Sequence, residues 1–207
     1  MTAAEPPALA PNHHGDHPGF SGITGFLAGL TMVLGRRQIA RLACDLTAVT
    51  ADGHVVDVGC GPGAAAREAA RRGAEVTGVD PASVMLGMAR RLTVGNLSVT
   101  WTEGAAEDLP LSDGAATVVW SLATVHHWPL LDEGLAEARR VLRPGGQFLA
   151  IERKTRPGAK GLASHGWIHG QADAFADRCR DAGFTDVSVA RHKPGWVPQL
   201  SVLAIRP

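Results

Sequence analysis

A glycine-rich turn and two aspartates are the residues in this sequence best suited to binding a ligand. The apolar run 55–58 contains Asp57 and leads into segment 59–63, in which glycine occupies every second position. Glycines let the backbone turn sharply and approach a ligand, and a helix that starts directly afterwards offers unpaired N–H groups. Asp80 follows a second apolar run, about 20 residues further on, where a carboxylate can bind both hydroxyls of a ribose. The spacing therefore predicts a site for a nucleoside.

The glycine turn by itself leaves two classes of ligand open. Gly59, Gly61 and Ala64 satisfy the dinucleotide-binding fingerprint, with alanine in its third place. However, Asp57 stands where an anion would repel a pyrophosphate and attract an amino group. Pro62 also makes the turn tighter than the dinucleotide pattern demands. A ligand with an α-amino acid at one end and a nucleoside at the other fits these residues better than NAD(P).

The turn is one of several motifs that follow each other in a recognisable order. The matching segments are 55–63, 77–90, 103–110, 118–127 and 140–146. Together they cover about residues 53–152, and in order and spacing this region resembles the class I S-adenosylmethionine-dependent methyltransferases. The resemblance is greatest to the small-molecule branch that includes quinone-biosynthesis enzymes.

The resemblance implies that the cofactor is S-adenosyl-L-methionine, and it assigns roles to individual residues. Asp80 would hold the ribose, a role compatible with capping the next helix, and Asp57 would hold the methionine amino group. Met85 would lie on the adenine face, although a methionine there suits the hydrophobic core equally well. Ala106 and Glu107 would meet the adenine edge. The implied cofactor-binding residues are Asp57, Gly59, Cys60, Gly61, Gly63, Asp80, Met85, Ala106, Glu107 and Ser121.

Histidines are the candidates for the acceptor side. Methyl transfer requires an aligned nucleophile, and an alcohol also requires a base of near-neutral pKa to remove its proton. His126 and His127 follow the fourth predicted strand, on the acceptor side of the family that the chain resembles. His169, with His165, lies in the variable stretch near the C-terminus. We therefore predict His126, His127 and His169 as catalytic candidates.

These residues favour methylation of a small molecule, most plausibly at a hydroxyl oxygen. Histidines and tryptophans near one mouth would suit a polar acceptor that stacks on indole, such as a sugar. Three alternatives remain open from the sequence: an NAD(P)-binding oxidoreductase, a C-methyltransferase of a quinone or lipid, and a non-catalytic protein that binds the nucleoside and a partner.

Strands that alternate with helices must position these motifs. The expected strands are 55–58, 75–79, 97–101, 116–120, 147–151, 184–190 and 200–205, and the expected helices are 36–49, 64–72, 81–92, 130–142 and 168–182. Such alternation predicts an α/β fold with a parallel sheet covered on both faces, and ligands bound beyond the carboxyl ends of its strands. The resemblance implies a three-layer, Rossmann-like doubly wound sheet of seven strands, in order 3-2-1-4-5-7-6 with strand 7 antiparallel. In this scheme 144–146 ends the helix 130–142.

Length and composition indicate one soluble domain. The chain has 207 residues, 45% of them hydrophobic, and its 20 Lys and Arg balance 20 Asp and Glu, so no basic surplus points to nucleic acid. Three scattered cysteines suit a reducing cytoplasm, and no apolar run is long enough to insert stably in a membrane.

Three regions follow from these patterns. Residues 1–19 are predicted to be a mobile lead-in. Its three histidines have no companion carboxylate pair, so no metal site is expected. Residues 20–50 read as an N-terminal helical cap, and residues 51–207 as the domain that binds S-adenosylmethionine. The apolar, glycine-rich segment 20–34 could close the site or meet a second copy of the chain, which leaves a homodimer open.

Overall fold

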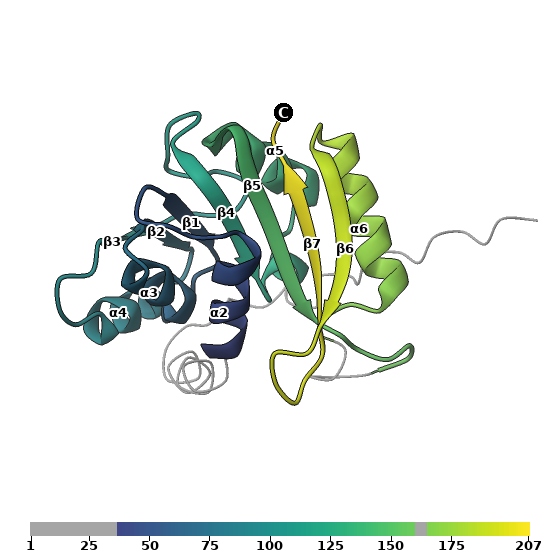
Figure 1. Ribbon diagram of the computed structural model, residues 1–207, viewed down its shortest axis with the longest axis horizontal. Coiled ribbons are helices and arrows are strands. Elements are labelled where there is room, and N and C mark those ends of the chain that lie inside the picture. The colour runs from purple at the N-terminus through teal and green to yellow at the C-terminus, as the bar shows by residue number, and fades with distance from the viewer. Residues whose placement is uncertain (1–36, 160–164) are drawn as a thin grey trace, which may run out of the picture.

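A seven-stranded mixed sheet forms the centre of the protein. The computed structural model describes residues 37–159 and 165–207 (Figure 1). The strands are β1 (His54–Val58), β2 (Glu75–Asp80), β3 (Val99–Glu103), β4 (Ala116–Leu122), β5 (Leu142–Arg153), β6 (Thr185–His192) and β7 (Gln199–Ile205). They lie in the order β3-β2-β1-β4-β5-β7-β6, with β1 to β5 parallel and β7 antiparallel to both of its neighbours. The predicted strand order and the reversed seventh strand are confirmed.

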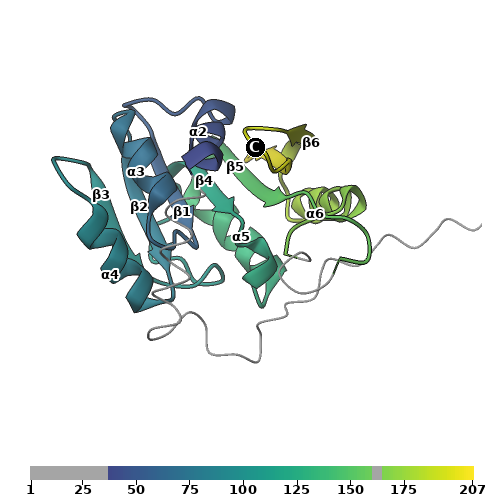
Figure 2. The same cartoon turned by 90° about the horizontal axis from the view of Figure 1, so that it is seen from below.

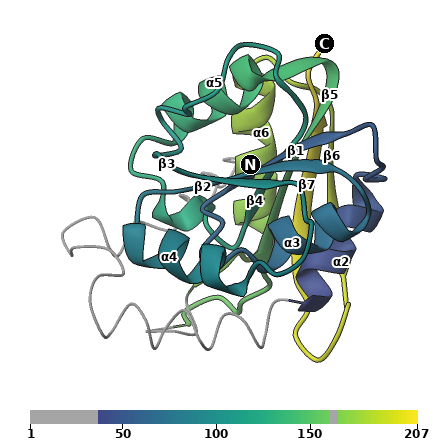
Figure 3. The same cartoon turned by 90° about the vertical axis from the view of Figure 1, so that its left-hand side faces the viewer.

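Helices cover both faces of this sheet. They are α2 (Arg37–Leu46), α3 (Ala64–Arg71), α4 (Ser83–Leu92), α5 (Leu131–Val141) and α6 (His169–Asp181), with a short 3₁₀ turn, η1, at Val125–His127. Seen along the sheet, α5 and α6 lie on one side, and α2, α3 and α4 on the other (Figures 2 and 3). The predicted three-layer arrangement is therefore present.

The alternation of side chains along the strands builds two separate cores. In β1, Val55 packs with α2 and α3, whereas its neighbour Val56 packs on the opposite face with α5 and α6. Successive strand side chains point to opposite faces, so a strand covered by helices on both sides must be apolar throughout. Within β1 the buried exception is Asp57, and a carboxylate kept in such a place points to function.

Several predicted boundaries were wrong. The third strand begins at Val99 and ends at Glu103, two residues later than expected, and the helix expected over 36–49 ends at Leu46. Segment 144–146 does not end α5, which finishes at Val141 and passes directly into β5. There, the Gly145 N–H donates to the carbonyl oxygen of Arg206 (2.8 Å), and the Arg206 N–H donates to that of Gly146 (2.9 Å). This pairing with the chain end has no signature in the local sequence.

Two predicted regions lie wholly or partly outside the described residues. The lead-in predicted for 1–19 and residues 20–36 of the cap predicted for 20–50 lie outside the described residues, which include residues 37–50 of the cap, with α2. Among the helices of residues 37–159 and 165–207, none is long and apolar enough to cross a membrane.

Candidate active site

The glycine turn is a left-handed loop bound to the end of the neighbouring strand. Gly59, Gly61 and Gly63 have φ angles of 70°, 53° and 75°, which side chains other than glycine rarely adopt. The N–H groups of Gly59 and Cys60 both donate to the carbonyl oxygen of Val79, at 2.8 and 3.1 Å. The end of β1 and the end of β2 are thus held against each other at the carboxyl edge of the sheet.

Asp80 links this loop to the next helix. One carboxylate oxygen, Oδ2, accepts from the N–H of Gly61 at 2.8 Å, and the other, Oδ1, accepts from the N–H of Ala82 at 2.9 Å. The side chain is buried, with the residue 7% exposed. Because each carboxylate oxygen has two acceptor sites, these bonds leave room for ribose hydroxyls. The predicted proximity of Asp80 to the glycine turn is therefore found, whereas the N-cap of α4 is Ala82, without a side-chain cap hydrogen bond, in place of Asp80.

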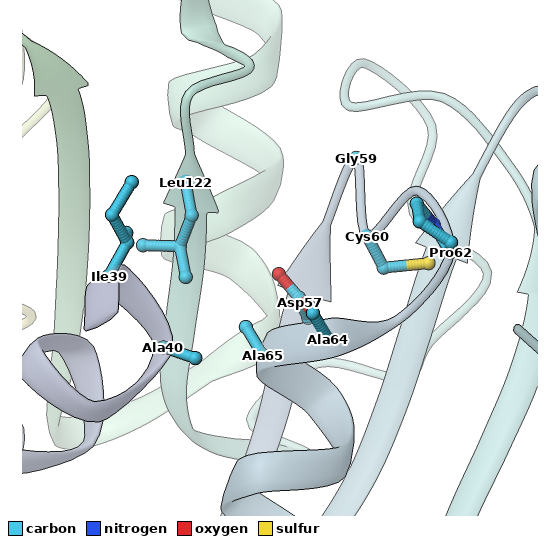
Figure 4. A pocket seen from close by; sticks show the side chains of 9 residues that line it. All are labelled: Ile39, Ala40, Asp57, Gly59, Cys60, Pro62, Ala64, Ala65 and Leu122. Atoms are coloured by element: carbon cyan, nitrogen blue, oxygen red, sulfur yellow. The ribbon is translucent and has the colours of Figure 1, made fainter. Parts of the chain in front are cut away.

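A pocket opens beside the loop, between α2, α3 and the ends of β1 and β4. Its lining comprises Ile39, Ala40, Asp57, Gly59, Cys60, Pro62, Ala64, Ala65 and Leu122. Figure 4 shows Ile39 and Leu122 facing each other, and the carboxylate of Asp57 between them and the start of α3. Among these described lining residues Asp57 carries the only charge, and it is 2% exposed. A buried anion in a small apolar pocket fits an ammonium group, as expected for the methionine end of the cofactor.

The indole of Trp101, a residue that the sequence analysis had assigned only to a strand, lies beneath the loop. A Cβ added to Gly63 would lie 2.1 Å from its ring, and one added to Gly78 would lie 2.4 Å from it. The third glycine of the turn is therefore required for packing as well as for its backbone angle. In the sequence, this contact is indicated only by the two glycines, because glycine leaves the space that the indole fills.

A pair of hydroxyls connects the loop to the acceptor side. The Ser121 and Thr124 hydroxyls are 2.7 Å apart, and the Thr124 hydroxyl donates to the carbonyl oxygen of Val58 at 3.1 Å. A Cβ on Gly59 would lie 2.7 Å from the methyl group of Thr124. Ser121, predicted to bind cofactor, is fully buried. It supports Thr124, which in turn holds η1 against the glycine turn.

The residues predicted to bind adenine lie on a loop and a helix beside β2 and β3. Met85 is 2% exposed within α4, and Ala106 is also buried. The Glu107 carboxylate accepts from the N–H of Leu130 at 3.3 Å, at the start of α5. Burial first, and the nearby Asp57 second, raise the pKa of the Cys60 thiol well above the usual value. Its side chain therefore stays protonated.

Arg140 of α5 holds the segment that follows the adenine residues. Its guanidinium donates to the carbonyl oxygens of Leu109 (3.0 Å) and Leu111 (2.8 Å) and to the carboxylate of Asp113 (2.7 Å). It also donates twice to Glu137, at 2.6 and 2.7 Å, and Glu137 in turn accepts from the N–H of Leu109 at 2.8 Å. This half-buried network keeps residues 109–113 close to α5.

Glu137 makes this network sensitive to acid. The hydrogen bonds from Arg140, and then that from Leu109, lower the pKa of Glu137 below its ordinary value of 4.5. A lowered folded pKa stabilises the protein above the unfolded value, and the stabilisation is lost as pH falls through the folded value. We expect Glu137→Gln to lower the free energy of unfolding by about 1 kcal/mol at pH 7 and by less at pH 3. Urea unfolding at both pH values measures this difference. An equal effect at both pH values, or an undiminished pH dependence in an Arg140→Leu background, would contradict it.

Three histidines gather at the carboxyl ends of β4 and β5. The rings of His126 and His127 have their centroids 4.0 Å apart, and that of His165 lies 5.4 Å from His126 and 6.3 Å from His127. The Nδ1 atom of His126 lies 3.0 Å from a carboxylate oxygen of Glu152, a residue that sequence analysis missed. The cluster thus contains two of the three predicted catalytic candidates.

The third candidate, His169, is placed differently. It is the first residue of α6, and its side chain is exposed. His165, which lies four residues earlier in the sequence, belongs to the cluster instead. In the part of the chain that the structure describes, no group of three His, Cys, Asp or Glu side chains is arranged to hold a metal ion.

Comparisons with known proteins agree with this arrangement. A family described as methyltransferase domain matches residues 56–150. Demethylmenaquinone methyltransferase of Tropheryma whipplei (strain Twist) is 38% identical over 114 residues, which are 54% of this chain and 46% of that protein. The chain thus matches about half the length of that relative. An uncharacterised methyltransferase of Mycobacterium bovis is 32% identical over 174 residues, which are 83% of this chain and 69% of that one.

The fold agrees as well. The crystal structure of an S-adenosylmethionine-dependent methyltransferase from Aquifex aeolicus has a TM-score of 0.69 and 19% identity, over 83% of this chain and 93% of that one. The sheet order, the glycine turn held by Asp80 and the sequence matches all lead to the same assignment. The chain belongs to the family of S-adenosylmethionine-dependent methyltransferase domains.

Proposed function

We propose that this protein transfers a methyl group from S-adenosylmethionine to an oxygen atom of a small-molecule acceptor, with a hydroxyl of a sugar-like compound as the expected class. The observation that carries this proposal is the position of one carboxylate, Asp80, at 2.8 Å from the N–H of Gly61. This hydrogen bond joins the glycine turn, which borders the pocket of Asp57, to the end of β2, where a ribose would bind. The histidine cluster is connected to that loop through Thr124, which donates to the carbonyl oxygen of Val58 and directly precedes η1.

The chain's own residues bind and orient the cofactor in this proposal. Asp57 holds the amino group of the methionine portion, and the backbone of the glycine turn lies along that portion. Asp80 accepts hydrogen bonds from the ribose hydroxyls. The wall contributed by Ile39 and Ala40 of α2 excludes water from the pocket, which supports a capping role for residues 20–50.

The acceptor side must remove a proton. When bound, S-adenosylmethionine supplies a methyl carbon on a sulfonium sulfur; as the acceptor oxygen bonds to this carbon, the carbon–sulfur electron pair stays on sulfur. His126 accepts the proton of the acceptor hydroxyl and later releases it to solvent. Thr124, two residues before His126 in the chain, positions it, because the Thr124 side chain packs on Gly59 and donates to the carbonyl oxygen of Val58. The proton acceptor is thereby tied to the loop that orients the methyl donor.

A second candidate is methylation at carbon. The relative named demethylmenaquinone methyltransferase favours a quinone-like acceptor. A hydroquinone would also need its hydroxyl proton removed before its ring carbon attacks, so the same histidine could act. The family assignment gives no support to the oxidoreductase alternative, which we do not pursue.

Calorimetric titration with S-adenosylhomocysteine tests cofactor binding. We expect one molecule bound per chain, and we expect Asp57→Asn to weaken the affinity about tenfold, because it removes the charge that faces the amino group. The exposed Asp52 provides the control, since Asp52→Asn leaves the pocket unchanged. If the wild-type protein gives no heat and no thermal stabilisation, the proposal fails.

A screen with methyl-labelled cofactor then separates the two acceptor classes. The panel contains simple sugars, phenols and demethylmenaquinol. Carbon-13 spectra distinguish a methoxy product from a ring-methyl product, and a ring-methyl product would replace the oxygen assignment by the carbon one. The other expectations from the sequence, a cytoplasmic location and a homodimer, stay predictions, and gel filtration with light scattering tests the latter.

A further inference from the structure

Glu152 is a buried carboxylate that the proposed binding steps do not use. It lies one residue before the end of β5, and in the antiparallel register it is opposite Leu200 of β7. The residue is 1% exposed. A carboxylate removed from water in this way is costly unless a partner compensates it. The partner is Nδ1 of His126, at 3.0 Å.

This contact decides which form of the His126 ring is present. A carboxylate oxygen only accepts, so the neutral imidazole must carry its hydrogen on Nδ1 and donate it to Glu152. The other ring nitrogen, Nε2, then has a free electron pair. Nε2 lies across the ring from the carboxylate. The His126 ring is thus oriented by Glu152 on one side and available as a proton acceptor on the other.

The contact also places a carboxylate beside one ring of the histidine cluster. With centroids 4.0 to 6.3 Å apart, His126, His127 and His165 cannot all become charged without mutual repulsion. An imidazolium at His126 would face the carboxylate of Glu152, which offsets its charge. His126 therefore has a carboxylate beside it that suits a protonated ring during the reaction.

We propose that Glu152 is a positioning residue that holds His126 in the Nδ1–H form and stabilises its protonated state, and so prepares Nε2 of His126 as the proton acceptor. The proposal rests on the proposed function, for which His126 accepts the acceptor's proton. The proton passes from the acceptor hydroxyl to Nε2 and then to solvent.

Nitrogen-15 spectra of the histidine rings test the first half of this proposal without cofactor or acceptor. In the wild-type protein, the neutral His126 ring should show a protonated Nδ1 and an unprotonated Nε2. Glu152→Met keeps the length and burial of the side chain and removes the acceptor. The His126 ring should then shift to the Nε2–H form, which free imidazole side chains favour. An Nε2–H ring in the wild type, or no shift in the variant, overturns the proposal.

Kinetics with the acceptor that turns over in the screen test the second half. Glu152→Met should lower kcat roughly 100-fold and Glu152→Gln roughly tenfold, with KM little changed, because the amide still accepts from Nδ1 but lacks the charge. His126→Gln should cost as much as Glu152→Met, and the double variant no more than either. Gln199→Met, a similar replacement of a buried polar residue on β7, is the control and should leave kcat unchanged.

The outcomes separate the two proposals. S-adenosylhomocysteine affinity should stay within twofold of wild type in Glu152→Met and Glu152→Gln. If the wild-type protein does not bind it at all, the proposed function fails, whatever the ring spectra show. If binding is intact but Glu152→Gln keeps full kcat, the carboxylate serves structure alone and the positioning role is refuted. Should Glu152→Met not fold, the spectrum and kcat of Glu152→Gln decide.

Discussion

Replacing Asp80 with alanine is expected to lower the affinity for S-adenosylhomocysteine by 100-fold or more. The carboxylate would accept two hydrogen bonds from the ribose, and hydrogen bonds to a charged group contribute about 1.5–3 kcal/mol each. Every 1.4 kcal/mol changes the dissociation constant about tenfold. The substitution also removes the acceptor of the Gly61 N–H, so the loop itself loses its support.

Calorimetry and urea unfolding measure the two parts of this effect. The free energy of unfolding should fall by about 1–3 kcal/mol, because two backbone N–H groups, of Gly61 and Ala82, lose their acceptor. Asp80→Asn retains one acceptor oxygen and should fall between wild type and Asp80→Ala in both measurements. Asp52→Ala, at an exposed position, should change neither. An Asp80→Ala protein that binds within threefold of wild type would remove the basis for the proposed cofactor site.

Adding one methyl group at Gly63 should destabilise the fold by about 3 kcal/mol or more. The residue has a φ of 75°, and its new Cβ would lie 2.1 Å from the Trp101 ring. A non-glycine residue with such a backbone angle costs about 1–3 kcal/mol, and overpacking costs a similar amount. Thermal and urea unfolding of Gly63→Ala measure the loss.

A second substitution separates the packing clash at Gly63 from its backbone strain. Trp101→Phe removes the part of the ring that the new methyl group meets, so Gly63→Ala should cost less in this background, and a double-mutant cycle gives the difference. Gly87→Ala, in the interior of α4 with no atom within 4 Å of the new Cβ, should stabilise the protein by about 0.5–1 kcal/mol. If Gly63→Ala melts like wild type, the close contact with Trp101 is not present.

The ordering of motifs made the fold predictable. Regular alternation of apolar runs and helix-forming segments is a local property, and the resemblance at 53–152 supplied the strand order, including the reversed β7. Boundaries were less predictable, because the end of an element depends on distant partners. Segment 144–146 joins β5 since it pairs with the chain end at Arg206, which no pattern around Pro144 indicates.

The same distinction between local pattern and distant contact applies to the candidate site. Types and spacing were enough to place Asp80 at the glycine turn, because adjacent parallel strands bring their carboxyl ends together. The pairing of His126 with Glu152, the entry of His165 rather than His169 into the cluster, and the indole beneath Gly63 were decided only by tertiary structure. Each joins residues from separate segments of the chain. Side-chain contacts between such segments depend on how strands and helices pack, and local periodicity contains no record of them.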